Sequence, residues 1–132
     1  MYHMKRLLAI FAVSFALNFV WEHAHAFLYA AYQGGPLTGF ILLRAALGDA
    51  IIITVLGALF IYFPTVGGRR WLIWPIGFAV AIFIEELALH TARWQYNSLM
   101  PLVPYLNIGL TPAVQLAVTG AAALWLVLWR KN

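Results

Sequence analysis

The residues of this chain best suited to acid–base chemistry are its acidic side chains, and each one lies inside a long apolar stretch. They are Glu22, Asp49, Glu85 and Glu86, and the chain holds no other Asp or Glu. A carboxylate at the centre of a bilayer costs about 2.5–3.5 kcal/mol, so acids inside apolar segments usually have a function. Burial and neighbouring charges shift the pKa of such a group, and acid–base catalysis needs one neutral acid beside one ionised partner.

Other polar residues follow helical spacing, so they share faces with these acids. Residues separated by three, four or seven positions lie on one side of a helix. Lipid cannot satisfy polar stripes, so on membrane helices they turn toward the interior of a bundle. Three stripes result: Asn18, Glu22, His25 and Tyr29; Glu86, His90 and Arg93; Thr111, Gln115 and Thr119.

Four apolar segments must position these groups. The composition is 64% apolar and 9% charged, against about 25% charged in soluble domains. This composition excludes a soluble enzyme, a disordered chain and a nucleic-acid-binding module. A membrane-crossing helix needs about 20 apolar residues, and the qualifying segments cover about 7–31, 39–63, 71–92 and 106–129. We therefore expect an all-α, four-helix transmembrane bundle that forms one domain over residues 1–132.

The basic residues predict the orientation of this multi-pass membrane protein. Six of the eight Lys and Arg residues fall on one side of the four-span plan, and only Arg44 and Arg93 fall toward the other. Cytoplasmic loops carry the excess of Lys and Arg, so both termini are expected in the cytoplasm. Ala24-His25-Ala26 fits the cleavage pattern of a signal peptide, but its neighbours are bulky or charged, so we expect the first segment to remain as a span.

The predicted site lies in the outer half of the bundle, in a cavity that residues 93–105 cover as a lid. A rise of 1.5 Å per residue brings Glu22, Asp49, Glu86 and Gln115 within about 5 Å of one depth. Glu22 and Glu86 are the expected proton donor and acceptor, in either order. The other predicted catalytic residues, which tune or relay protons, are Asp49, His25 and His90. The predicted substrate-binding residues are Asn18, Trp21, Tyr29, Arg44, Glu85, Arg93, Trp94, Tyr96 and Gln115.

Two short stretches resemble membrane proteins that process isoprenoids. The stretch Asn18-Phe19-Val20-Trp21-Glu22 resembles the Asn-x-x-Trp-Glu segment of fungal integral-membrane terpene cyclases. The stretch 93–96, with Met100-Pro101 and residues 109–112, is similar to a region of carotenoid-processing membrane proteins. The resemblance covers under a third of the chain, and those cyclases have more than four spans. The leading hypothesis from the acid–base residues is an intramembrane enzyme that protonates an alkene or epoxide in a lipophilic, isoprenoid-like substrate, followed by cyclisation or isomerisation. The resemblance implies the same class of reaction.

Two other functions remain open from the sequence. A single membrane carboxylate suffices for a proton-coupled exporter, and small four-span exporters of this kind work as dimers, so a homo-oligomer is one expectation. Glu22-x-x-His25 also matches one element of di-iron bundles. A divalent metal would then use Glu22, His25, Glu86 and His90, and haem would use the two histidines. The leading hypothesis needs no cofactor, and its partners are the lipid bilayer and a lipophilic small molecule, with no nucleic acid.

Overall fold

Four long helices make up most of the protein. The computed structural model describes residues 1–131, and its long helices are α1 (Tyr2–His25), α2 (Gly39–Tyr62), α4 (Ile73–His90) and α5 (Leu110–Leu124). With their short helical extensions, all four are long and apolar enough to cross a membrane. This agrees with the expected number of spans. The shorter helical turns are η1 (Ala26–Leu28), α3 (Pro64–Gly67), η2 (Arg70–Leu72) and the π-helical turn η3 (Trp125–Trp129).

Two small sheets correct the expectation of a purely α-helical chain. Strand β1 (Tyr29–Tyr32) pairs antiparallel with β2 (Trp94–Tyr96), and β3 (Leu102–Val103) pairs with β4 (Ile108–Gly109). The first span was expected to run to residue 31, but α1 ends at His25. Aromatic residues favour strands, and backbone groups that leave a helix need new hydrogen-bond partners. The segments before and after the long helices satisfy each other in this way.

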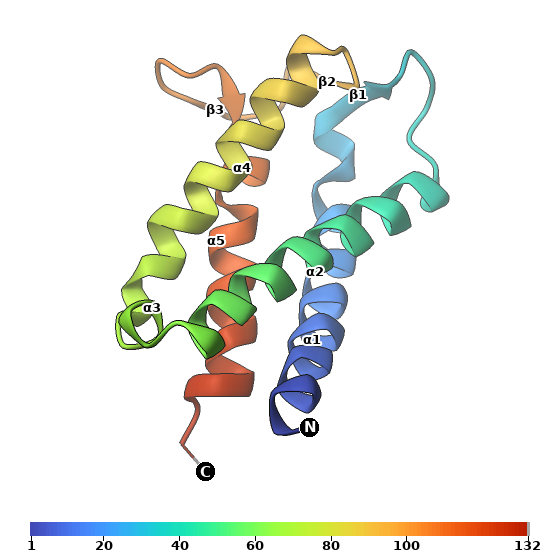
Figure 1. Ribbon diagram of the computed structural model, residues 1–132. Helices are drawn as coiled ribbons and strands as arrows, with labels where there is room; N and C mark the ends of the chain where they lie inside the picture. The colour runs from blue at the N-terminus through green and yellow to red at the C-terminus, as the bar shows by residue number, and fades with distance from the viewer. Residues whose placement is uncertain (132) are drawn as a thin grey trace.

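The helices are arranged as two packed pairs (Figure 1). Helix α2 packs along α1, and α4 packs along α5, while α1 and α5 join the pairs. Both termini and α3 lie at one end of the bundle, and the β-strands lie at the other. Toward the strand end, α2 and α4 diverge and contact one another little. This divergence leaves room between them.

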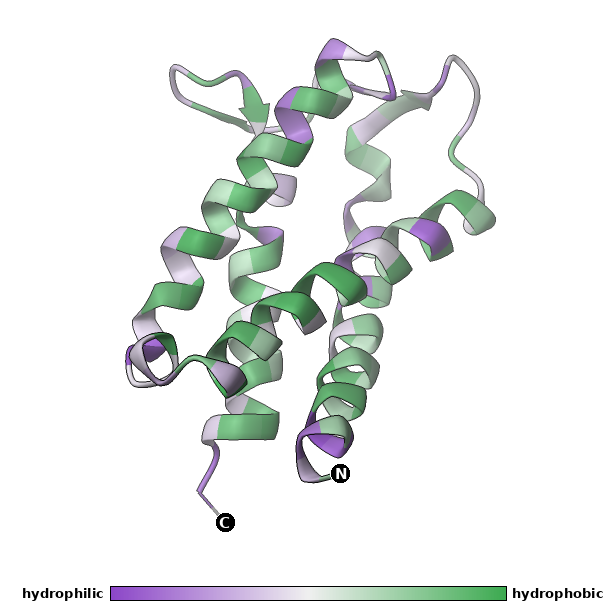
Figure 2. Cartoon of the chain, viewed as in Figure 1, coloured by the Kyte–Doolittle hydropathy of each residue, from purple (hydrophilic) through white to green (hydrophobic). Residues whose placement is uncertain are grey.

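The apolar core fills the end of the bundle that holds the termini. Its members include Ile10 of α1, Ile53 and Phe60 of α2, Ile73 of α4 and Leu124 of α5, all buried. Hydrophobic residues predominate along the four long helices (Figure 2), and large apolar side chains such as Leu8 and Phe83 are more than 60% exposed. Such a surface matches lipid rather than water.

A left-handed turn directs the chain back over the bundle after α4. The amides of Ala92 and Arg93 donate to the carbonyls of Leu89 and Ala88, which is the Schellman arrangement at a helix end. Ala92 takes the left-handed position with a φ of 53°, where glycine is the usual residue. The turn places Arg93 and Trp94 next to β1, and the Gln33 amide donates to the Arg93 carbonyl. Residues 93–105 thus lie at the strand end, where the sequence predicted a lid.

Candidate functional site

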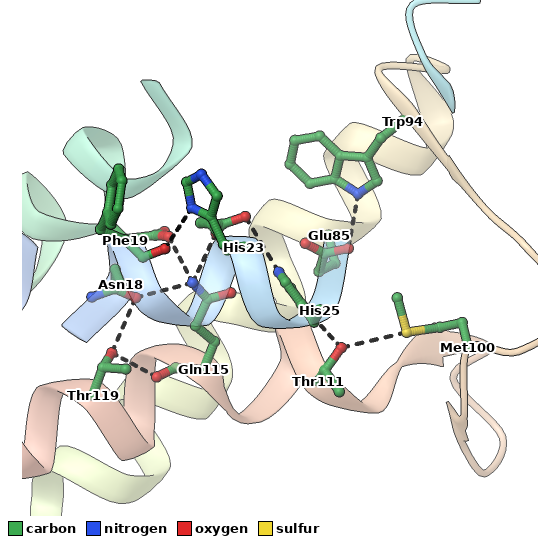
Figure 3. Close-up of polar contacts among 12 residues, drawn as sticks. Asn18, Phe19, His23, His25, Glu85, Trp94, Met100, Thr111, Gln115 and Thr119 are labelled. Atoms are coloured by element: carbon green, nitrogen blue, oxygen red, sulfur yellow. Dashed lines mark hydrogen bonds and ion pairs between the residues drawn. The ribbon is translucent and has the colours of Figure 1, made fainter. Parts of the chain in front are cut away.

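The side-chain amide of Gln115 joins three helices at the centre of a buried polar cluster (Figure 3). Its Nε2 atom lies 3.0 Å from Asn18 Oδ1, 2.8 Å from Glu22 Oε1 and 2.9 Å from Asp49 Oδ2. Asn18, Glu22 and Gln115 are all at least nine-tenths buried. An amide nitrogen carries only two hydrogens, so the three oxygens compete for them. The carboxyl groups of Glu22 and Asp49 are thereby held close together.

Neutral side chains fix the orientation of this amide. Thr119 Oγ donates to the backbone carbonyl of Gln115 at 2.7 Å and lies 3.3 Å from Asn18 Oδ1. Asn18 in turn donates its own amide to the carbonyl of Ser14 at 2.8 Å. The i, i+4 spacing of these contacts agrees with the stripes expected on the first and fourth spans. These hydrogen bonds hold Asn18 and Thr119 in place, and Asn18 Oδ1 in turn holds the Gln115 amide.

His25 connects Glu22 to the start of α5. Its Nε2 lies 3.3 Å from Glu22 Oε2, and its Nδ1 lies 2.9 Å from Thr111 Oγ. The ring is 5% exposed. With both ring nitrogens engaged, His25 can exchange a proton with Glu22 without changing its place.

Glu85 is held by two aromatic side chains from β2. Its Oε2 accepts from Trp94 Nε1 at 3.0 Å and from the Tyr96 hydroxyl. Burial and the neighbouring Glu85 carboxyl raise the pKa of Tyr96, and the same two causes raise the pKa of Tyr29. Both phenols therefore stay protonated and can donate hydrogen bonds. The ring of Tyr29 packs edge-on against Trp94 and Tyr96, with centroids 6.4 and 5.5 Å apart.

A cavity of about 380 Å³ lies between α2 and α4, and Glu22, Asp49, Glu85 and Gln115 are among its lining residues, whereas His25 and Tyr96 are not. Three carboxylic acids, two arginines and three aromatic side chains line it, and most of the other lining residues are apolar. A smaller engineered cavity of about 150 Å³ already holds benzene, so this one is large enough for a branched or cyclic hydrocarbon. The polar and aromatic lining residues are Glu22, Tyr29, Tyr32, Arg44, Asp49, Glu85, Arg93, Trp94 and Gln115.

No family model, no curated protein and no solved structure matches the chain. The residues that line the cavity therefore indicate which reactions are possible there. Acids at one wall, aromatic rings at another and apolar side chains between them suit proton transfer to or from a hydrophobic molecule.

Glu86 and His90 lie outside this site, contrary to the prediction. Their ion pair of 3.4 Å stays within α4, and their side chains are 44% and 81% exposed. Consecutive helical residues point about 100° apart, so only one of Glu85 and Glu86 can face the cavity, and it is Glu85. The proposed pairing of Glu22 with Glu86 is therefore wrong in geometry, and Asp49 is the acid that lies beside Glu22.

The predicted metal and haem ligands do not meet either. His25 is buried against Glu22, while Glu86 and His90 point outward from another helix. Within residues 1–131, no group of three or more His, Cys, Asp or Glu side chains is placed to hold a metal ion. Neither Arg44 nor Arg93 balances a carboxylate through an ion pair in this part of the chain.

Trp21 also differs from the expectation. It lines an apolar groove between α1 and α5, together with His25, and does not reach the cavity. Asn18 lies beneath the cavity and supports it through Gln115. Tyr32 and Gly48 also line the cavity, although the sequence did not predict them there. Tyr32 follows Tyr29 by three residues and Gly48 precedes Asp49, but neither pattern was specific enough to select them.

Proposed function

We propose that this protein is an intramembrane acid–base enzyme that isomerises or cyclises a lipophilic, isoprenoid-like substrate. One observation carries the proposal: the carboxyl groups of Glu22 and Asp49 share the Gln115 amide at the wall of an otherwise largely apolar cavity. Because the four helices are long and apolar enough to cross a membrane, we expect lipid-soluble molecules to reach this cavity.

The paired acids supply both halves of a proton transfer. Two ionised carboxylates this close repel one another, so such pairs share one proton. The acid that holds the proton adds it to an alkene carbon, which leaves a carbocation on the neighbouring carbon. The other carboxylate removes a proton from an adjacent carbon and restores a double bond. Atoms and charge balance without a co-reactant, and the proton then returns from the second carboxyl group to the first for the next turnover. His25, which contacts Glu22, is a further group that can exchange a proton with that acid.

The remaining walls suit the intermediate and the entry of the substrate. The rings of Tyr29 and Trp94 line the cavity, and aromatic faces stabilise cations within about 6 Å. Residues of α2 and α4 line opposite sides of the cavity, and these two helices contact one another little. A hydrophobic substrate can thus enter from the lipid between them. The exporter alternative has less support, because an apolar core fills the other half of the bundle.

Deuterium uptake tests the proposal. The purified protein in lipid nanodiscs is incubated in D₂O with geraniol, farnesol, geranylgeraniol and squalene, and the extracted lipids are analysed by mass spectrometry. We expect a rearranged product that carries deuterium from the solvent. Glu22→Gln and Asp49→Asn should each lower the rate about 10²- to 10⁴-fold, the usual contribution of a positioned acid or base.

The matched control is Glu86→Gln, which removes an acid from the exposed face of α4. It should retain the rate of the unchanged protein. Two results would contradict the proposal. One is an equal loss of deuterium uptake in the Glu22, Asp49 and Glu86 variants, and the other is no deuterium uptake with any of these substrates.

A further inference from the structure

Two exposed arginines line the cavity, and within residues 1–131 their guanidinium groups have no hydrogen-bond or ion-pair partner. Arg44 of α2 and Arg93 beyond α4 both line the cavity, and both are exposed. Within residues 1–131, neither guanidinium donates a hydrogen bond or forms an ion pair, and the nearest aromatic contact is Arg44 over the Phe40 ring at 5.8 Å. Ten N–H donors, five on each group, are therefore available to a ligand.

Among the residues that the structure describes, these are also the only Lys or Arg residues at the strand end of the bundle. The other six lie toward the end that holds α3 and both termini (Figure 1): Lys5, Arg6, Arg69, Arg70, Arg130 and Lys131. Anchoring at a membrane interface does not require both arginines of one end to line the same cavity. Their shared position indicates a ligand that reaches both.

The distance between the arginines and the paired acids indicates how long that ligand must be. Asp49 lies five residues beyond Arg44 on α2, or about 7 Å along the helix axis. A molecule that spans the cavity would thus meet positive charge at the opening and the paired acids farther in. Arginine binds phosphate and carboxylate oxygens through two parallel hydrogen bonds, which lysine cannot do.

We propose that the cavity binds an amphiphile with an anionic head group, held by Arg44 and Arg93, whose hydrocarbon chain extends to Glu22 and Asp49. The inference rests on the proposed function, because it names the class of substrate for the same cavity. Phosphate monoesters and carboxylates of isoprenoid alcohols and acids have this chemistry.

Calorimetric titration of the purified protein in detergent tests the proposal with three probes: farnesyl phosphate, farnesol and inorganic phosphate. We expect farnesyl phosphate to bind at least about tenfold more tightly than farnesol, because hydrogen bonds to charged groups contribute strongly to binding. Arg44→Gln and Arg93→Gln should each lower the affinity for farnesyl phosphate about tenfold and leave the affinity for farnesol unchanged. Arg44→Lys and Arg93→Lys should lose less affinity for farnesyl phosphate than the Gln variants do. Added salt should lower the affinity for farnesyl phosphate but not that for farnesol.

Arg130→Gln is the control, because it removes an exposed arginine from the opposite end of the bundle. Equal affinity for farnesyl phosphate and farnesol would overturn the proposal, as would an equal loss in Arg130→Gln. Inorganic phosphate that competes at similar concentrations would show that a free anion is the ligand and would overturn it too. Binding by Glu22→Gln separates this proposal from the proposed function, since head-group binding should persist without turnover.

Discussion

A single amide decides how the acids of the cavity are arranged at the scale of residues. Gln115 Nε2 is within 3.0 Å of oxygens on Asn18, Glu22 and Asp49, which compete for its two hydrogens. A buried polar group that loses its partner costs about 1–3 kcal/mol. The separation of the two carboxyl groups, and with it their ability to share a proton, depends on this donor.

Replacing Gln115 with methionine should therefore destabilise the protein while keeping the length of the side chain. We expect Gln115→Met to lower the free energy of unfolding by about 1–3 kcal/mol, because the buried oxygens of Asn18 and Glu22 and the half-buried oxygen of Asp49 lose their common donor. Thermal unfolding in detergent, followed by circular dichroism, measures the change. Gln95→Met is the matched control, since Gln95 is exposed on β2. A similar loss in both variants would contradict this role for the amide.

The sequence was sufficient to predict the residues of α1 and α5 that meet, but not those of α4. The spacing of Asn18, Glu22 and His25 defined one helical face, and the structure turns that face inward. Glu85 and Glu86 are neighbours, and the stripe of Glu86 with His90 looked more regular. Glu85 faces the cavity because Trp94 and Tyr96 donate to it. That interaction comes from a strand, which a helical pattern cannot show.

Close contact between α4 and α5 gives the cavity one rigid wall at the scale of elements. A Cβ atom on Gly77 would lie 2.7 Å from Ala117 Cα and 2.8 Å from its backbone nitrogen, too close for either helix to keep its position. Gly48 of α2 is the opposite case, because a Cβ there would meet nothing within 4 Å. Both glycines lie in helices. Replacing each one with alanine therefore distinguishes the cost of close packing from the gain in helix propensity.

Gly77→Ala should lower the free energy of unfolding by about 1–3 kcal/mol, the usual effect of overpacking. Gly48→Ala should leave it unchanged or raise it by up to about 1 kcal/mol, because alanine is the better helix former. Thermal unfolding of the two variants in the same detergent makes the comparison direct. If Gly48→Ala is the more destabilised variant, the close approach of α4 and α5 does not limit the packing.

Apolar length and Gly or Pro breaks were enough to predict the four long helices to within a few residues at most ends. The exceptions were the two ends of α1, which starts five residues and stops six residues before the predicted bounds. At its end, Tyr29–Tyr32 pairs with β2 instead of continuing the helix. Strands of two to four residues depend on a partner distant in the sequence, so periodicity alone could not predict them.

The two ends of the whole molecule differ in the number of basic residues. Six of the eight Lys and Arg residues lie toward the end with both termini. The residues that line the cavity include Tyr29, Tyr32 and Trp94 of the strands at the other end. The excess of positive charge stays in the cytoplasm during insertion. The cavity should thus face the outer half of the membrane, and the proposed substrate should enter from the outer leaflet.

Single cysteines can test this orientation, because the chain contains none. Thr65→Cys marks α3 at the positive end, and Ser98→Cys marks the exposed segment beyond β2. Both side chains are exposed and neither substitution changes a charge, so the positive-inside preference is undisturbed. A membrane-impermeant maleimide should label Ser98→Cys in intact bacterial cells, and Thr65→Cys only after the membrane is permeabilised. The reverse pattern would place the cavity on the cytoplasmic side, and the substrate would then have to come from the inner leaflet.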